Sequence, residues 1–278
     1  MTTHSTAQPL IPGMRWMLYA AGVLVFISGI QLFVLSDFTD QFFAWTIKPS
    51  LTAAFLGAAY WSSCVMEIAA ARQSRWVDAR VSVPAVFIFT SLTLVVTLLH
   101  IDRFHFNRPE PLAQAAAWAW LLVYALVPIA LAVLLVVQLR APGSEPPRQH
   151  SLPSGVAITL ALQALPMVVI GLMLLITPAV LIPHWPWALT PLTARAIGAW
   201  SLALGLALAH SLWENDWVRV RVATLSYTVF GVLELIALLR YTGDVDWNKP
   251  QSLVYVLFML SMVVVGVYSW QRSRSIAS

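Results

Sequence analysis

The stretch MRWMLYAAGVLVFISGIQLFVL, residues 14–35, is almost entirely apolar and carries a single charged residue. A run of about 20 apolar residues spans a bilayer as a helix, because each backbone N–H and C=O group is paired inside the segment. The run is too long for the apolar part of a typical signal peptide, and no small-x-small cleavage site follows it. We therefore interpret it as a structural membrane helix.

Similar runs recur along the whole chain of 278 residues, of which 59% are hydrophobic and only 10% are charged. A soluble domain usually has about 25% charged residues. The composition predicts an all-α integral membrane protein with about eight transmembrane helices in contact with the lipid bilayer. The predicted spans are 14–35, 49–71, 80–100, 112–139, 155–177, 190–212, 218–240 and 250–270.

Two phrases 142 residues apart indicate an internal repeat: FFAWTIKPSLTAAFLGAAYW at 42–61 and HWPWALTPLTARAIGAW at 184–200. One deleted residue keeps the two halves in register from the first span of each to the last. The matched pairs are Gly29/Gly171, Trp45/Trp187, Pro49/Pro191, Thr52/Thr193, Gly57/Gly198, Trp76/Trp217, Arg80/Arg221 and Pro109/Pro250. Each copy has four spans, and with an even number both copies enter the membrane from the same side. We therefore predict two parallel four-helix repeats, 14–140 and 155–271.

The segment between the repeats, residues 141–154, is rich in Pro and Ser and is predicted to be a flexible cytoplasmic linker. The charges of the loops support a cytoplasmic location for this segment, since short cytoplasmic loops carry more Lys and Arg than loops on the other side. Of the 16 Lys and Arg, ten lie on the side of the termini and six on the other. We predict a multi-pass cell-membrane protein with cytoplasmic N- and C-termini.

Net charge and cysteine content exclude several functions. The formal net charge is +4, but the basic residues lie in short loops rather than on one face, which argues against nucleic acid as a partner. Cys64 is the only cysteine, so the chain has no internal disulfide and no thiolate metal cluster. HIDRFH, residues 100–105, spaces its two His by five, which does not place them on one helical face. We predict no metal and no cofactor.

The second copy of the repeated phrase contains WPW at 185–187 and LTPLTAR at 189–195, followed by Gly198 and Trp200. This pattern resembles a phrase of uncharacterised bacterial multi-pass membrane proteins, and the resemblance implies no activity. The first copy lacks WPW and the Arg.

Local patterns within the phrase predict structural roles. Thr190 is expected to cap a helix whose first residue is Pro191. Small residues four apart, such as Ala53 and Gly57, predict close packing between membrane helices. Trp61 and Trp200 lie in the middle of spans, where packing is favoured over lining a cavity.

Ionisable residues inside spans are the candidates for function, because charge is costly in a bilayer. Glu67 lies near the cytoplasmic end of its span and is expected to snorkel to the interface beside Arg72. Glu234 lies about 24 Å along its span, at 1.5 Å per residue, among apolar residues. Arg195 enters its span from the outer side, in the first helical turn, where the dipole disfavours a cation. We predict that Arg195 pairs with Glu234, with a lipid headgroup or interface as the alternative partner.

These residues suggest three functions. The first is a carrier or binding protein for a small molecule or ion, with an outward-facing ligand site formed by Arg195, Glu234, Arg240 and His100. The second is a structural or accessory subunit of a membrane complex. The third is a lipid-modifying membrane enzyme that uses Glu67 or Glu234 as acid or base, although we assign no catalytic residue.

Overall fold

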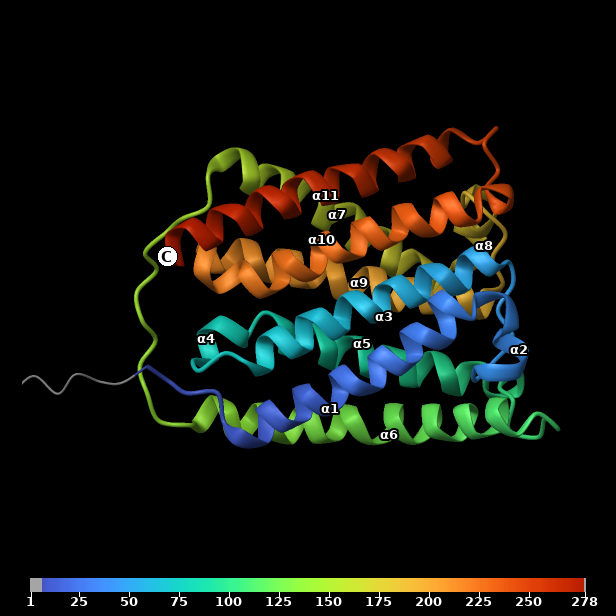
Figure 1. Ribbon diagram of the computed structural model, residues 1–278, viewed down its shortest axis with the longest axis horizontal. Coiled ribbons are helices and arrows are strands. Elements are labelled where there is room, and N and C mark those ends of the chain that lie inside the picture. Colours follow the sequence, from blue (N-terminus) through green and yellow to red (C-terminus); the bar gives the residue numbers. More distant parts are fainter. Residues whose placement is uncertain (1–6, 278) are drawn as a thin grey trace, which may run out of the picture.

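The computed structural model describes residues 7–277 and consists mostly of helices (Figure 1). Among these residues, eight helices are long and apolar enough to cross a membrane, which confirms the predicted all-α membrane fold. The long helices are α1 Pro12–Gly29 with its π-helical continuation Ile30–Val34, α3 Ser50–Ala71, α5 Ser82–Leu99, α6 Pro111–Arg140, α7 Ser154–Ile176, α9 Pro191–Glu214, α10 Trp217–Arg240 and α11 Pro250–Ala277. The connections contain α2 Thr39–Phe42, α4 Trp76–Ala79, α8 Pro178–Leu181 and the 3₁₀ turns Ser36–Phe38, Ile101–Arg103, Ile182–His184 and Thr242–Asp244.

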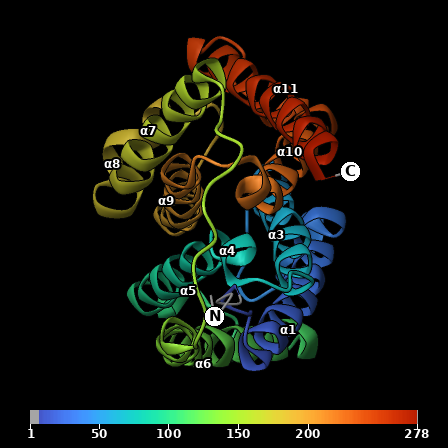
Figure 2. The same ribbon diagram turned by 90° about the vertical axis from the view of Figure 1, so that its left-hand side faces the viewer.

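The long helices form two groups of four, seen end-on in Figure 2. The first bundle is α1, α3, α5 and α6, and the second bundle is α7, α9, α10 and α11. Within the first bundle α1 packs on α3 and α5 on α6; within the second, α7 packs on α9 and α10 on α11. The two bundles meet where α3 packs on α10 and α5 packs on α9.

Burial separates central from peripheral helices. In the most apolar window of α3, 78% of the residues are buried, whereas the figure for α6 is 22%. Large apolar side chains such as Leu126, Ile129 and Val133 cover the outside of α6. Contact of such a large apolar surface with water is unfavourable, so the outer face of α6 is the surface that lipid would solvate.

The helix starts follow from local chemistry. Thr190 accepts a hydrogen bond from the backbone N–H of Thr193 at 3.2 Å, and Pro191 is the first residue of α9, so the predicted cap is confirmed. Asp216 caps α10 by accepting from the backbone N–H groups of Val218 and Arg219. Asn215, in the left-handed conformation with φ 45°, joins α9 to α10 in a tight turn.

Glycines allow the closest helix contacts, as the spacing of small residues predicted. A Cβ on Gly57 would lie 2.4 Å from the backbone N of Phe33. A Cβ on Gly198 of α9 would lie 2.9 Å from the carbonyl oxygen of Gly171 in α7. Backbone atoms cannot rotate away as a side chain can, so both crossings require glycine.

The segment between the bundles makes hydrogen bonds to the turn between α9 and α10, and its predicted flexibility stays a prediction. Its backbone N–H groups at Gln149 and His150 donate to Asp216 Oδ2 at 2.8 and 3.1 Å. Leu152 donates to Asn215 Oδ1 at 3.1 Å, and its side chain is buried. The turn between α9 and α10 thus supplies acceptors that the composition of residues 141–154 did not reveal.

An ion network fastens the segment to both bundles. Arg80, before α5, and Arg219 of α10 both donate to Glu214, at 2.8 and 3.0 Å to Oε2. Both arginines also lie 2.7 Å from Glu145 Oε1 in the linking segment. The hydrogen bonds from Arg80 and then Arg219 lower the pKa of Glu145 to about 2. The network lies at the end of the molecule that holds the described ends of the chain, which we call the terminal end (Figure 1).

Candidate functional site

Arg195 and His100 lie together at the opposite end of the molecule, the loop end. Arg195 Nη1 is 2.9 Å from His100 Nε2, and Arg195 Nε donates to the carbonyl oxygen of Leu175 at 3.0 Å. A guanidinium can only donate, so His100 Nε2 accepts and the ring proton resides on Nδ1. Burial, and next the positive charge of Arg195, lower the pKa of His100, which keeps the ring neutral.

The predicted ion pair between Arg195 and Glu234 is wrong. Arg195 lies on the face of α9 that meets α7 and the end of α5, whereas Glu234 lies on the face of α10 that meets α11. Their similar depth followed from residue counting, but the direction of each side chain is set by how its helix packs. Of the four predicted ligand residues, the structure brings together only Arg195 and His100.

Arg240 has a third, separate environment. Its Nη1 donates to the carbonyl oxygen of Phe33 at 2.6 Å and its Nη2 to that of Val34 at 3.3 Å. Asp37 Oδ2 lies 3.8 Å from Nη2. A cation at the end of a helix stabilises its unpaired carbonyls, so Arg240 caps the end of the first span from the second bundle.

Glu234 is fully buried between α10 and α11. Tyr255 of α11 donates its hydroxyl proton to Glu234 Oε2 at 2.9 Å. The other oxygen, Oε1, has no hydrogen-bond partner among the described residues. A buried polar atom of this kind is costly in a folded protein, so it points to a functional role.

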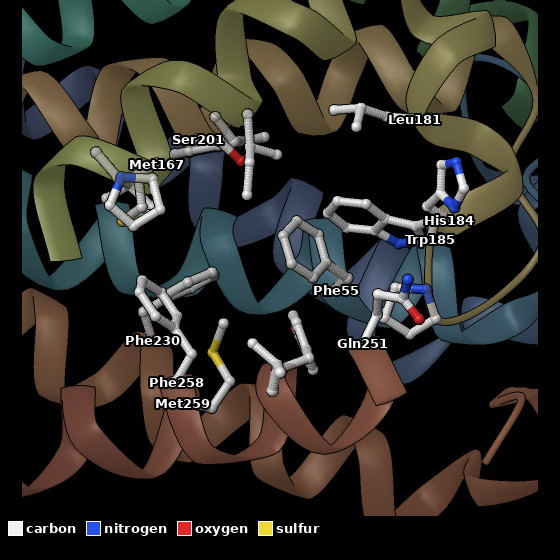
Figure 3. A pocket seen from close by; sticks show the side chains of 17 residues that line it. Phe55, Met167, Leu181, His184, Trp185, Ser201, Phe230, Gln251, Phe258 and Met259 are labelled. Atoms are coloured by element: carbon white, nitrogen blue, oxygen red, sulfur yellow. The ribbon is translucent and has the colours of Figure 1, made fainter. Parts of the chain in front are cut away.

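Tyr255 also lines a cavity of about 360 Å³, the second-bundle cavity (Figure 3). The cavity lies between α7, α9, α10 and α11, and Phe55 of α3 closes one side. His184, Trp185 and Gln251 lie near one end, and Met167, Phe230 and Phe258 near the other (Figure 3). Mostly aromatic and aliphatic walls with few polar groups are typical of small-molecule sites.

Sequence reasoning missed most of these lining residues. Trp200 lines the cavity, whereas its mid-span position favoured ordinary helix packing. Tyr255 in an apolar span and Trp185 in the WPW phrase were visible, but only packing shows that they share one cavity. Phe55 comes from the other bundle, and no pattern in the sequence links it to α11.

The first bundle contains a cavity of about 310 Å³, the first-bundle cavity, between α1, α3, α5 and α6. Glu67 lines it and is only 1% exposed. Snorkelling beside Arg72 is therefore not what the structure shows: the carboxylate turns inward, where Ser63 Oγ donates to Oε1 at 3.1 Å.

Comparisons with known proteins add no identity. No family model, curated protein or solved structure matches the chain. The resemblance of residues 185–195 to uncharacterised bacterial membrane proteins thus stays a prediction. Across residues 7–277, no group of three His, Cys, Asp or Glu is placed to hold a metal ion.

Proposed function

We propose that the protein is a membrane carrier or binding protein for a small, mostly apolar molecule that carries one hydrogen-bond donor. The second-bundle cavity is the proposed site. The observation that carries the proposal is the position of Tyr255, which lines the cavity while its hydroxyl proton is held by the buried Glu234.

The geometry selects the polar group of the ligand. A tyrosine hydroxyl has one proton and can also accept hydrogen bonds. Because the Tyr255 proton is directed at Glu234, the hydroxyl oxygen has only its acceptor capacity left for a ligand in the cavity that Tyr255 lines. Donation to the Glu234 carboxyl oxygen polarises the phenol and strengthens it as an acceptor. Glu234 therefore positions Tyr255, and Tyr255 meets the ligand.

The test is saturable binding of 4-bromophenol, with bromobenzene as the probe that lacks a donor. Bromine quenches tryptophan fluorescence, and Trp185 and Trp200 line the cavity. We expect 4-bromophenol to bind the purified protein more tightly than bromobenzene. Tyr255→Phe should weaken 4-bromophenol binding about three- to tenfold, the effect of one hydrogen bond of about 1 kcal/mol, and leave bromobenzene unchanged.

Two further variants localise the binding. Ser201→Phe fills the cavity and should remove saturable quenching. Leu239→Phe is the matched control, because Leu239 is 80% exposed on α10 and lines neither cavity. Failure of folded wild-type protein to bind either probe would leave the accessory-subunit role as the better account. Flux of 4-bromophenol across protein-containing liposomes would distinguish a carrier from a binding protein.

We also infer that the two bundles are parallel repeats with cytoplasmic termini. The helix neighbours support this inference, since each contact in the first bundle has its equivalent in the second. The two cavities support it too, because matched positions line both. These pairs are Leu24/Pro166, Val25/Met167, Ser28/Ile170, Phe43/Trp185, Tyr60/Ser201, Ser63/Leu204 and Phe89/Phe230.

A further inference from the structure

The first-bundle cavity differs chemically from its counterpart. Leu204 of α9 lines the second-bundle cavity, whereas the equivalent residue of α3, Ser63, lines the first-bundle cavity and donates a hydrogen bond to Glu67. Tyr60 and Tyr124 add two hydroxyl groups whose oxygens lie 2.5 Å apart. The first-bundle cavity is therefore lined by more polar residues than its counterpart, and one of them, Glu67, carries a carboxyl group.

The carboxyl group of Glu67 is incompletely satisfied. Ser63 occupies Oε1, and Oε2 is buried with no hydrogen-bond partner among the described residues. No Lys, Arg or His lines the cavity, and Glu67 forms no ion pair within residues 7–277. A carboxylate without a cation is costly inside a membrane protein, so a cation that entered the cavity would stabilise its charged form.

Aromatic rings surround the rest of the cavity. Phe43, Tyr60, Phe89, Trp120 and Tyr124 all line it, and the Trp120 and Tyr124 ring centroids are 4.4 Å apart. Aromatic faces attract organic cations and also pack against apolar groups. A carboxylate oxygen within an aromatic wall is the arrangement that binds an ammonium group attached to an apolar body.

We propose that the first-bundle cavity binds a lipophilic amine in its ammonium form. The ammonium group donates to Glu67 Oε2, and the apolar body lies against the aromatic rings. At about 310 Å³ the cavity has room for a single aryl-alkyl amine. This site is separate from the one at Tyr255, and its ligand is a cation rather than a neutral donor.

The test compares 4-phenylbutylamine with 4-phenylbutanol, which has nearly the same shape and no charge. Binding to purified protein in nanodiscs is measured by isothermal titration calorimetry, with empty nanodiscs subtracted to remove lipid partitioning. We expect wild-type protein to bind the amine at least tenfold more tightly than the alcohol. Equal affinities in folded wild-type protein would overturn the proposal, whatever the variants do.

Glu67→Gln tests the residue. The amide oxygen can still accept from Ser63, so the variant should fold, and size-exclusion chromatography checks this. We expect it to bind both compounds with equal affinity. Glu234→Gln is the matched control, since it changes the other buried carboxyl, and it should keep the preference for the amine. A Glu67→Gln protein that retains the full preference would overturn the assignment.

A third variant separates this site from the proposed function. Ala116→Phe adds a ring to the first-bundle cavity and should abolish amine binding while leaving 4-bromophenol binding at Trp185 and Trp200 intact. If the wild-type protein does not bind 4-bromophenol but still prefers the amine to the alcohol, only the Tyr255 site is contradicted. Retained amine binding in Ala116→Phe would place the amine elsewhere and overturn this proposal alone.

Discussion

At the scale of single residues, buried charge in this protein is paired wherever the helices meet the segment between the bundles. Glu214 is fully buried and binds Arg80 and Arg219, whose side chains are 12% and 4% exposed. Taking one member from such a group leaves the others buried without compensation, which costs more than the pair contributed. Glu145 completes the network from a half-exposed position, where water screens it.

This difference predicts unequal effects of two similar substitutions. Glu214→Gln should lower the free energy of unfolding by about 3 kcal/mol, because the buried guanidinium of Arg219 and the mostly buried one of Arg80 lose their main counter-charge. Glu145→Gln is the matched control and should cost no more than about 1 kcal/mol. SDS-induced unfolding followed by circular dichroism measures both. Equal losses in the two variants would show that burial does not decide the strength of this network.

At the scale of elements, backbone contact sets the distance between helices. Gly57 of α3 touches the backbone at Phe33, at the end of the first span, and Gly198 of α9 touches Gly171 of α7. The two contacts occupy matched positions in the two halves. Gly155, at the start of α7, has no atom of residues 7–277 within 4 Å of the position a Cβ would take. The fold therefore gives different roles to helical glycines: Gly57 and Gly198 lie at close helix contacts, whereas Gly155 does not.

We expect Gly57→Ala to destabilise the protein by about 1–3 kcal/mol, because its methyl group would force α3 away from the first span. Gly155→Ala should be neutral or slightly stabilising, since alanine favours the helix and meets nothing. Thermal unfolding of the detergent-solubilised variants measures the difference. An unfolding temperature of Gly57→Ala equal to that of the wild type would show that α3 and the first span can separate without cost, which contradicts close packing at Gly57.

At the scale of the whole molecule, two polar ends enclose eight apolar spans, and the charges of those ends predict the orientation. The terminal end carries ten of the 16 Lys and Arg. Positive residues in short loops are retained in the cytoplasm, so the loop end with Arg195, His100 and Arg240 should face outward. Both cavities would then lie within the bilayer, between helices that lipid surrounds.

Cysteine labelling checks this orientation in intact cells. In a Cys64→Ser background, Gly243→Cys marks the exposed loop end and Gln271→Cys the exposed terminal end. A membrane-impermeant maleimide should label Gly243→Cys in intact cells and Gln271→Cys only after permeabilisation. The reverse pattern would contradict cytoplasmic termini.

The eight spans and the caps at Thr190 and Pro191 could be predicted, because both depend on local properties. Apolar length sets a span, and a hydroxyl before a proline sets a helix start. The repeated phrase predicted the close approach at Gly57, since small residues four apart permit it in any pair of membrane helices.

Side-chain direction could not be predicted, because each residue advances about 100° around its helix and only packing fixes the helix rotation. In the structure Arg195 therefore contacts His100 and Leu175 rather than Glu234. Glu67 points into the bundle, where it binds Ser63, rather than toward Arg72. The hydrogen bonds of residues 149–152 depend on acceptors at Asn215 and Asp216, which come together only once α9 and α10 have formed their turn. By itself the sequence determined how many helices are long and apolar enough to cross a membrane, and where they begin. The tertiary structure decided which side chains share a cavity, because a cavity lies between helices and no single helix contains it.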